Sequence, residues 1–396
     1  TMLRTLKSFD IKGQTILIRL DLNVPIHEEA IQDDFRIKSC LPTINYCLEE
    51  GAAVVLMSHL GRPKGKYSKD FSLMPVGEHL ASLLEIPIKF SSDCISQDAI
   101  DTSLSLKPGE VHLLENLRFH KEESENDSLF SNKLSKHGRI YINDAFGTAH
   151  RAHASNHGVI DNFKNYGIGF LFEKEMKYLR EVVNKPERPL VLILGGSKVS
   201  TKLELINKYL SQADKIIIGG GMVFTFFKAM GYNIGKSLVE TKMIDQARNI
   251  LDAARLNGNK IILPSDVVCA EDINSTLRGN SVSVRDIPEN SMGLDIGSKT
   301  IEKYLSVLDE AKTVLWNGPM GVFENEVFSH GTKAVADKLV EIVEKESVVI
   351  AGGGDTASAL RNFKLVDNVS HVSTGGGASL ELMSGNQLDA INKLEI

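Results

Sequence analysis

The sequence is poor in several features that would assign it to a protein class at once. Its 396 residues include four cysteines and one tryptophan, and its net charge is −6. The missing basic excess argues against a dedicated nucleic-acid binder. The scattered cysteines contain no CxxC pair, which favours free thiols in a reducing compartment over a disulfide framework. They are Cys40, Cys47, Cys94 and Cys269.

Long apolar stretches are also missing. No run approaches the roughly 18 residues of a membrane span, and the first ten residues hold no apolar core of a signal peptide. We therefore expect a soluble, cytoplasmic protein that binds neither membranes nor nucleic acid. With 42% hydrophobic and 24% charged residues, the chain is long enough for two or three domains with sizeable cores.

Short apolar runs rich in Ile, Val and Leu recur along the chain, with helical patterns between them. Continuous apolar strands that alternate with helices predict parallel sheets covered on both faces, in two α/β domains. A helical pattern over 172–183, followed by a proline-punctuated break over 184–189, marks the seam between the domains. The expected strands are 16–20, 53–57 and 111–114 in the first half, and 190–194, 215–218, 260–263, 313–316 and 348–351 in the second.

Glycine follows almost every expected strand of the second half. In open parallel sheets ligands bind at the carboxyl ends of the strands, where glycine lets backbone N–H groups approach an anion. A single glycine pair is more often a tight turn, but five at corresponding positions predict a phosphate-binding edge. The glycine runs lie at 195–196, 219–221, 318–321, 352–354 and 375–377.

The details of two familiar nucleotide motifs argue against them, although a nicotinamide dehydrogenase stays an alternative that a titration with NAD would test. Residues 231–237 are one spacer residue short of a Walker A loop. Residues 352–357 fit the dinucleotide pattern G-x-G-x-x-A, but no acidic residue closes the next strand to bind a ribose. Asp355 lies inside that loop, where it would repel a pyrophosphate. This carboxylate is better explained as a Mg²⁺ ligand.

Charged residues beside the expected strand ends predict anion binding in both halves. Lys198 and Lys202 lie one turn apart at the expected start of a helix, where lysine opposes the helix dipole unless an anion is present. The first half carries arginines near strand ends and turns, and their forked donors would suit a small polyanion if they converge. These are Arg19, Arg36, Arg62, Arg118 and Arg151.

A metal site on histidines is a weaker alternative for the first half. His150, His153 and His157 are closely spaced, but neither a cysteine nor an HExxH motif accompanies them. Hydrogen-bonding histidines in a loop-to-helix segment are the better explanation of the spacing.

The motifs together resemble the phosphoglycerate kinase family along essentially the whole chain. The resemblance lies in the segments Arg19–Pro25, Ser58–Pro63, Glu115–Phe119, Asn143–Ser155, Leu194–Val199, Gly219–Met222, Leu315–Glu324, Gly352–Thr356 and His371–Ser379. It implies two Rossmann-like three-layer α/β/α domains with parallel sheets, joined by a hinge helix. The implied divisions are a 3-phosphoglycerate-binding domain (1–171), a helix and hinge (172–189), a nucleotide-binding domain (190–378) and a tail that returns to the first domain (379–396).

The resemblance also implies the activity and the roles of individual residues. The expected reaction is reversible, Mg²⁺-dependent phosphoryl transfer from 1,3-bisphosphoglycerate to ADP, by a monomer that closes about its hinge. Substrate would bind at Asp21, Asn23, Arg36, His59, Arg62, Arg118 and Arg151, with His150 adjoining. The nucleotide would bind at Gly195, Lys198, Lys202, Gly219, Gly220, Asn317, Pro319, Val322, Glu324, Gly352, Gly353, Gly354, Asp355 and Thr356, with Asp355 on Mg²⁺. Gly375 and Gly376 would meet the moving phosphoryl group.

For catalysis we expect Arg36 and Lys198 to supply positive charge, together with backbone N–H groups at Gly353 and Gly376. Two positions depart from the family pattern. Ser197 stands where the family usually has alanine, and 386–390 replaces a usual Leu-Pro-Gly segment. A non-enzymatic alternative, a phosphosugar- or polyanion-binding protein, would explain the arginines but not the glycine loops.

Overall fold

The computed structural model describes residues 2–396, which divide into two compact units. The first unit runs to Lys177 and also includes Asn386–Ile396, and the second is Tyr178–Gly385. The break therefore falls inside the segment that the sequence marks as the seam. The last eleven residues belong to the first unit, whereas residues 379–385 belong to the second.

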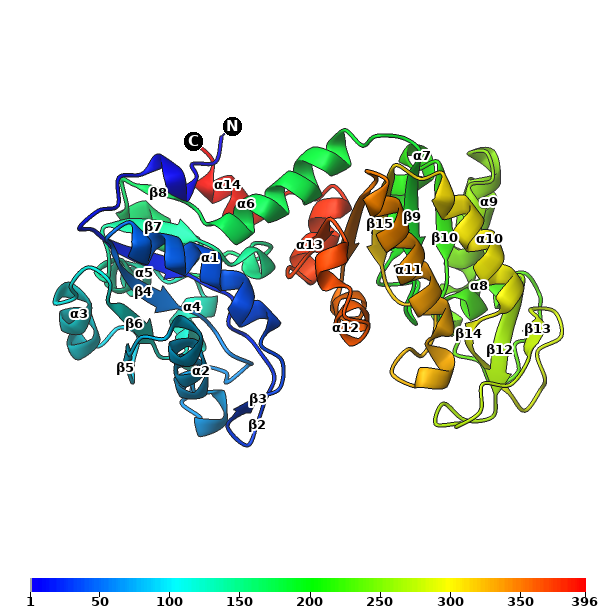
Figure 1. The fold of residues 1–396 in the computed structure, drawn as a ribbon, viewed down its shortest axis with the longest axis horizontal. Helices are drawn as coiled ribbons and strands as arrows, with labels where there is room; N and C mark the ends of the chain where they lie inside the picture. The colour runs from blue at the N-terminus through cyan, green and yellow to red at the C-terminus, as the bar shows by residue number, and fades with distance from the viewer. Residues whose placement is uncertain (1) are drawn as a thin grey trace. The chain divides into compact units, whose positions relative to one another are not determined.

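The first unit is built on a six-stranded parallel sheet in the order β5-β6-β4-β1-β7-β8 (Figure 1). Arg19, Met57 and Asn143, the last residues of β1, β4 and β7, lie in register, so these strands end along one edge. The strands are β1 (Thr15–Arg19), β4 (Ala53–Met57), β5 (Ile88–Ser91), β6 (Val111–Leu114), β7 (Ile140–Asn143) and β8 (Tyr166–Ile168), with a hairpin of β2 (Ile26–His27) and β3 (Ala30–Ile31).

Helices of the first unit bury apolar stripes against this sheet. Along α1 the residues Ile37, Cys40, Ile44 and Cys47 are buried, which is helical spacing. Side chains cap some helix starts locally, as when Asp127 accepts the amide of Phe130 at the start of α5. The helices are α1 (Phe35–Glu49), α2 (Met74–Leu84), α3 (Gln97–Leu104), α4 (Lys121–Ser124), α5 (Ser128–Ser135), α6 (Phe170–Met176) and α14 (Asp389–Leu394).

The second unit has its own six-stranded parallel sheet, β11-β10-β9-β15-β16-β17. A separate antiparallel sheet, β13-β12-β14, was not expected from the sequence. The strands are β9 (Leu190–Leu194), β10 (Lys215–Ile218), β11 (Ile261–Ile262), β12 (Asp266–Ala270), β13 (Ser281–Ser283), β14 (Met292–Ile296), β15 (Thr313–Asn317), β16 (Val348–Gly352) and β17 (His371–Val372).

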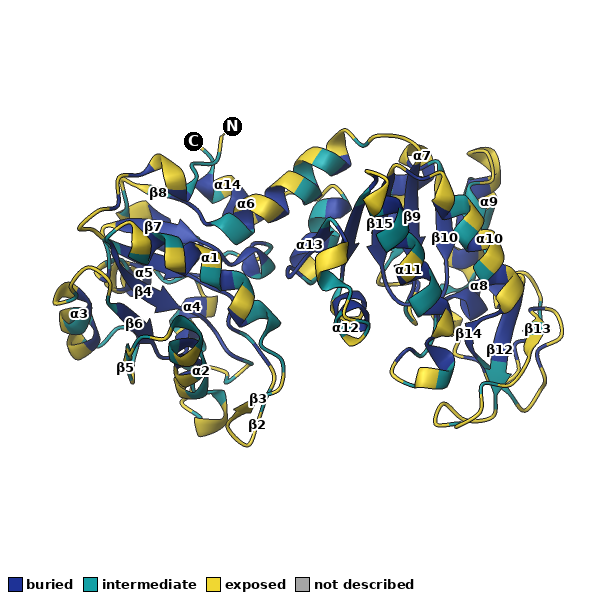
Figure 2. Ribbon diagram, in the orientation of Figure 1, coloured by how far each residue is buried: buried dark blue, intermediate teal, exposed yellow. Residues whose placement is uncertain are grey.

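The helices of the second unit are α7 (Leu203–Gln212), α8 (Val223–Ala229), α9 (Ile244–Leu256), α10 (Ser298–Asp309), α11 (His330–Glu344), α12 (Gly354–Asn362) and α13 (Gly377–Met383). In both units the central strands are buried throughout and the helices expose only their outer faces (Figure 2). This confirms the expected α/β class with parallel sheets.

Two expectations about helix limits need correction. The helix predicted over 172–183 begins at Phe170 and continues beyond Met176 as a π-helix over Lys177–Val182. The helix after β9 begins at Leu203, with Lys202 as its N-cap. Lys198 therefore lies in the preceding loop and not in the first helical turn.

All four cysteines are free thiols, as the sequence suggests, and Cys40, Cys47 and Cys94 are buried. None of the helices formed by residues 2–396 combines the length and the apolar character that a membrane crossing requires.

Candidate functional site

In the first unit, the predicted arginines and their neighbours follow the carboxyl ends of four parallel strands. Arg19 is the last residue of β1 and 20–23 follow it, 58–62 follow β4, 115–118 follow β6, and 144–151 follow β7. Arg36 comes from the first turn of α1. Because these strands end along one edge, the chain positions the charged groups near each other.

Arg19 forms the buried floor of this cluster. Its side chain is fully buried, and its Nε donates to Ser155 Oγ at 2.8 Å. Glu123, also buried, lies 3.9 Å from the guanidinium and accepts from the Ser155 hydroxyl at 2.6 Å. The protein thus satisfies Arg19 internally, so this arginine is a structural member of the cluster and a fixed source of positive potential.

His59 is held neutral beside Arg19. The guanidinium lies 3.1 Å from His59 Nδ1, and a guanidinium can only donate, so Nδ1 accepts and the ring proton is on Nε2. Burial, reinforced by Arg19, Arg118 and Arg36, holds the pKa of His59 well below its usual range. A neutral imidazole with a free Nε2–H can donate to an anion without adding charge.

Asn23 joins two of the strand-end loops. Its carbonyl accepts from Arg36 Nη1 at 2.8 Å, and its side-chain oxygen accepts from the Gly61 amide at 2.9 Å. Gly61 in turn accepts from Arg118 Nη1 at 2.9 Å. Asp21 lies 3.5 Å from Arg36. This chain of contacts holds Arg36 and Arg118 in fixed orientations while Arg36 stays about one third exposed.

The surroundings of Arg118 disfavour its positive charge. Its pKa is lowered to about 10, first by burial and then by Arg19, Arg151 and Arg62, although Glu123 opposes this. Its Nε is buried without a hydrogen-bond partner among the described residues. A guanidinium placed among like charges with an unused buried donor would be stabilised by an anion. Arg62 and Arg151 are exposed and complete the basic patch.

His153 and its neighbour His150 adjoin this patch, whereas His157 lies 3.2 Å from the side-chain amide of Asn126. The pKa of His153 is lowered to about 4 by burial and by Arg19, Arg118 and Arg151. Within residues 2–396, one group brings three potential ligand atoms within 4.8 Å of one another, and it is Asp93, Cys94 and His120. The metal alternative for His150, His153 and His157 therefore has no support in the geometry.

The glycines of the second unit fall into two kinds. Gly195, Gly219 and Gly220 follow β9 and β10, where an added Cβ would collide with backbone or side-chain atoms of the loop after β15 or of neighbouring loops. At Gly220, for example, a Cβ would lie 2.5 Å from Gly196 N and 2.8 Å from Pro319 O. These glycines let the strand-end loops pack directly onto each other.

Other glycines of this edge face open space. No described atom lies within 4 Å of a Cβ built at Gly196, Gly354 or Gly376, and Gly196 and Gly376 have positive φ of 94° and 52°. Gly353, with φ of 92°, precedes α12, and Gly376 precedes α13. Their backbone amides are at helix starts, where an anion is favoured.

Lys202 and Asn317 link the loops after β9 and β15. Lys202 Nζ donates to Asn317 Oδ1. Burial lowers the pKa of Lys202 to about 8. The negative charge of Asp355 acts in the opposite direction, so the two groups attract each other. Lys198 is exposed, in the loop before α7. Thr356 is buried and accepts the Gly318 amide at 2.8 Å.

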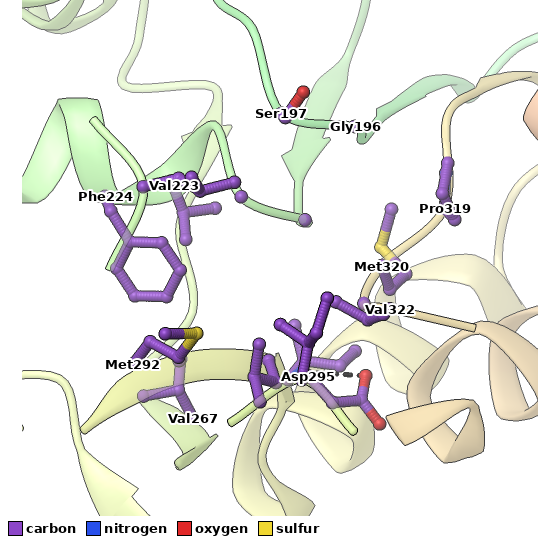
Figure 3. Close-up of a pocket in the computed structure, with 18 of the residues that line it drawn as sticks. Gly196, Ser197, Val223, Phe224, Val267, Met292, Asp295, Pro319, Met320 and Val322 are labelled. Atoms are coloured by element: carbon purple, nitrogen blue, oxygen red, sulfur yellow. Dashed lines mark hydrogen bonds between the residues drawn. The ribbon is translucent and has the colours of Figure 1, made fainter. Parts of the chain in front are cut away.

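A cavity of about 440 Å³ opens beside these loops within the second unit. Apolar side chains of α8 and β14, among them Phe224 and Met292, lie across it from Met320 and Val322 (Figure 3). Gly220, Pro319, Val322, Glu324 and Asp355 are the predicted nucleotide-site residues that line it. Lys202, Asn317 and Thr356 lie outside its lining.

Asp355 fits the requirements of Mg²⁺ in the presence of phosphates. It is exposed in the first turn of α12, next to Gly353 and Gly354. Mg²⁺ commonly takes one or two carboxylates together with phosphate oxygens and waters, and it needs no closed protein cage. A single exposed carboxylate beside a glycine loop provides that donor set.

Sequence reasoning missed residues that support the site. Asn116 fixes two loops, because its side chain donates to Leu60 O at 2.7 Å and Phe71 O at 2.9 Å and accepts from the Arg118 amide at 3.0 Å. The Glu123–Ser155 pair and the apolar wall of the cavity were also missed. Asn116 has a signal, an asparagine two residues after an apolar strand, whereas the other residues come together only through the fold.

Comparisons with known proteins agree over nearly the full length. A family model described as phosphoglycerate kinase matches residues 6–386. Phosphoglycerate kinase of Chlorobium chlorochromatii is 47% identical over 392 residues, which cover 99% of both chains. The protein of the same name from Thermosipho africanus is 48% identical over 388 residues, covering 98% of this chain and 96% of that one.

Solved structures give the same result. The phosphoglycerate kinase structure from Coxiella burnetii has a TM-score of 0.88 at 38% identity and covers 99% of both chains. That from Pyrococcus horikoshii has a TM-score of 0.86 at 31% identity, covering 99% of this chain and 98% of the other. By family model, sequence relatives and fold alike, the chain belongs to the phosphoglycerate kinase family.

Proposed function

We propose that the protein catalyses reversible phosphoryl transfer from 1,3-bisphosphoglycerate to ADP, giving 3-phosphoglycerate and ATP, in glycolysis and gluconeogenesis. The observation that carries the proposal is the pairing of two complementary sites in one chain. The first unit holds a cluster of arginines around Arg118, and the second holds an apolar cavity beside glycine-rich loops.

The arginine cluster matches the chemistry of a phosphoglycerate. That substrate carries a carboxyl and a phosphate group, and guanidinium forks bind both in bidentate fashion. Arg118 offers an unused buried Nε donor, and His59 offers a neutral N–H. We assign substrate binding to Asp21, Asn23, Arg36, His59, Arg62, Arg118 and Arg151.

The second unit matches a nucleoside diphosphate or triphosphate. The apolar walls of the cavity would cover a planar base, with Pro319, Val322 and Glu324 in contact with the nucleoside. The phosphates would meet Lys198, Lys202, Asn317, Thr356 and backbone amides at 195, 219–220 and 352–354. Asp355 would hold Mg²⁺, which supplies charge neutralisation to the phosphate oxygens.

The reaction requires alignment and charge compensation and no general base. The acceptor in the ATP-consuming direction is a carboxylate, which is already ionised near pH 7. Negative charge on the transferred phosphoryl oxygens must instead be balanced. We assign that role to Arg36 and Lys198, helped by the backbone N–H groups of Gly353 and Gly376.

Substitution of Arg36 tests this assignment. Loss of an arginine that balances charge in phosphoryl transfer costs about 10³–10⁵-fold in kcat. We expect Arg36→Ala to lower kcat at saturating substrates by at least about 10³-fold. Arg139→Ala, at an exposed position of the same unit, should leave kcat unchanged. Near-normal turnover of Arg36→Ala would remove this residue from the mechanism.

We further propose that the protein acts as a cytoplasmic monomer that closes about residues 172–189 when both substrates bind. Closure would exclude water and suppress ATP hydrolysis. Small-angle X-ray scattering should then show a smaller radius of gyration with 3-phosphoglycerate and a non-hydrolysable ATP analogue together. An unchanged radius in the ternary complex would contradict closure, and sedimentation at the mass of a dimer would contradict the monomer.

A further inference from the structure

A buried carboxylate in the first unit contacts the first turn of helix α6. Asp144 directly follows β7, and its side chain is fully buried. It has no part in the substrate and nucleotide sites described above. A buried carboxylate is costly unless it is hydrogen-bonded or paired with an opposite charge.

The Asp144 side chain caps the start of α6 from another part of the chain. Its Oδ1 accepts the amide of Phe172 at 3.1 Å, and the Leu171 amide and the Thr43 hydroxyl also donate to the carboxylate. Thr43 Oγ1 accepts the Phe170 amide at 3.0 Å. The first three amides of α6, which its own helix cannot satisfy, are therefore all held by these two side chains.

The backbone and the neighbouring ring fit this contact closely. A Cβ at Gly169, the N-cap of α6, would collide with the Asp144 carboxylate. Phe146, two residues after Asp144, packs edge-to-face on Phe172 with ring centroids 5.5 Å apart. Glycine at 169 is thus the residue that lets the carboxylate reach the helix, and the two rings fix the approach.

The backbone of Asp144 is joined to the end of β1 and continues into the loop that carries Arg151. Its amide donates to Arg19 O at 2.9 Å, at the end of β1. The chain after it runs through Phe146–Thr148 to Arg151, whose carbonyl is held by Asn156 Nδ2 at 2.9 Å. One residue therefore joins the loop that carries Arg151 to the first turn of α6, the helix that leads out of the unit.

The carboxylate is held in a setting that disfavours its charge. Its Oδ2 is buried without a hydrogen-bond partner among the described residues. Burial raises the pKa of Asp144 to about 6, against the hydrogen bonds from Thr43 and the two amides, and Glu175 of α6 raises it further. From α1, Cys40 and Cys47 face it, and their thiol pKa values are raised in turn by burial and by Asp144.

The ionised form therefore costs stability at neutral pH. The folded pKa lies above the ordinary value of 3.8, so the neutral form favours folding and ionisation opposes it as the pH rises through about 6. A carboxylate hydrogen-bonds amides about twice as strongly as a neutral acceptor does. The protein thus keeps a tighter hold on α6 at the expense of stability, which is the pattern of a functional residue.

We propose that Asp144 is a positioning residue for phosphoryl transfer, whose carboxylate transmits ligand occupancy of the arginine cluster through the 145–151 loop to the first turn of α6. The proposal rests on the proposed function, because it takes 3-phosphoglycerate as the ligand of that cluster. An anion that orders Arg151 and Arg118 would fix the loop, and the loop fixes the cap on α6.

Hydrogen exchange on the full chain tests this coupling. In the wild type, 3-phosphoglycerate alone should slow amide exchange in a peptide spanning 170–176 by about fivefold or more. Asp144→Asn keeps the shape and presents a neutral oxygen, so it should lose most of this slowing at pH 7.5. It should also lower kcat by about fivefold or more while the KM for 3-phosphoglycerate changes less than twofold.

The pH dependence of kcat distinguishes a positioning role of Asp144 from a role in stability alone. Between pH 5 and 7 the wild-type kcat should rise as Asp144 ionises, and Asp144→Asn should lose that part of the rise. Asp127→Ala, which removes the side-chain cap of α5 in the same unit, should lower thermal stability without changing the exchange response or kcat. Asp144→Asn should unfold at a temperature equal to or above that of the wild type.

A second variant guards against an unexpected effect of the asparagine. Thr43→Val removes the hydroxyl that accepts from Phe170 and donates to Asp144, and it should reproduce part of the loss. If both variants keep the ligand-induced slowing and the wild-type kcat, the proposal is wrong. A wild type without turnover would overturn the proposed function as well, whereas intact coupling in the variants overturns only the role of Asp144.

Discussion

Acidification should destabilise the first unit through a buried chain of hydrogen bonds. His137 Nε2 lies 2.7 Å from the Cys94 carbonyl, which can only accept, so His137 Nδ1 is an acceptor. Ser103 Oγ, 2.6 Å away, must donate to it and therefore accepts from His112 Nδ1 at 2.8 Å. His112 Nε2 then accepts from Ser91 Oγ at 2.6 Å. The chain fixes both rings in their neutral forms.

The size of the effect follows from His112. Burial, with smaller effects from His137 and Lys89, lowers its pKa to about 4. Below the ordinary value of 6.5, the unfolded chain takes up a proton that the folded chain excludes until about pH 4. Stability is therefore full above pH 6.5 and falls as the pH drops, by roughly 2 kcal/mol between pH 7 and pH 5 from this residue alone.

Urea unfolding at several pH values measures this loss. Circular dichroism follows both units, while fluorescence of Trp316 reports the second unit alone and serves as a reference. His112→Asn should reduce the proton uptake on unfolding near pH 5 by about one proton. His27→Asn, at an exposed histidine, should not change it. Equal pH slopes in wild type and His112→Asn would refute the reasoning.

Three further predictions address single features. Gly220→Ala should destabilise the protein by at least about 2 kcal/mol, because the added Cβ would collide with backbone atoms. Gly196→Ala should cost only about 1 kcal/mol, for the positive φ alone, and urea unfolding compares the two variants. Glu28 and Glu29 have φ of 48° and 62° in the β2–β3 turn, so replacing them with Asn-Gly should raise the melting temperature, and an unchanged value would argue against strain there. ATP binding near pH 8 should be accompanied by uptake of about half a proton, because the phosphates favour the charged form of Lys202. Calorimetry in two buffers measures this uptake, and Lys202→Met should abolish it.

The parallel sheets could be predicted because their strands are continuous apolar runs. Ala53–Met57 and Val111–Leu114 were predicted with their observed limits. The antiparallel sheet was missed, since β13 has only three residues and β14 carries glycine and aspartate among its apolar residues. Short and interrupted strands are defined by their partners in the sheet and not by local sequence.

Site residues could be predicted where they belong to one sequence motif, and not where the fold brings distant residues together. The arginines and glycines follow strands in the sequence itself. By contrast, Glu123 and Ser155 balance Arg19 over long separations, and Asp144 meets α6 from 28 residues away. Lys198 was placed in a helix because its apolar neighbours continue the helical period, but the chain makes a turn over 199–202 before α7.

The most direct test of the account is ATP consumption with Mg²⁺, with and without 3-phosphoglycerate, coupled to NADH oxidation through a dehydrogenase that reduces the acyl phosphate. The account predicts turnover that requires both substrates and is lost in Arg36→Ala. Ligand binding at both sites without turnover would contradict it and favour a polyanion-binding protein instead.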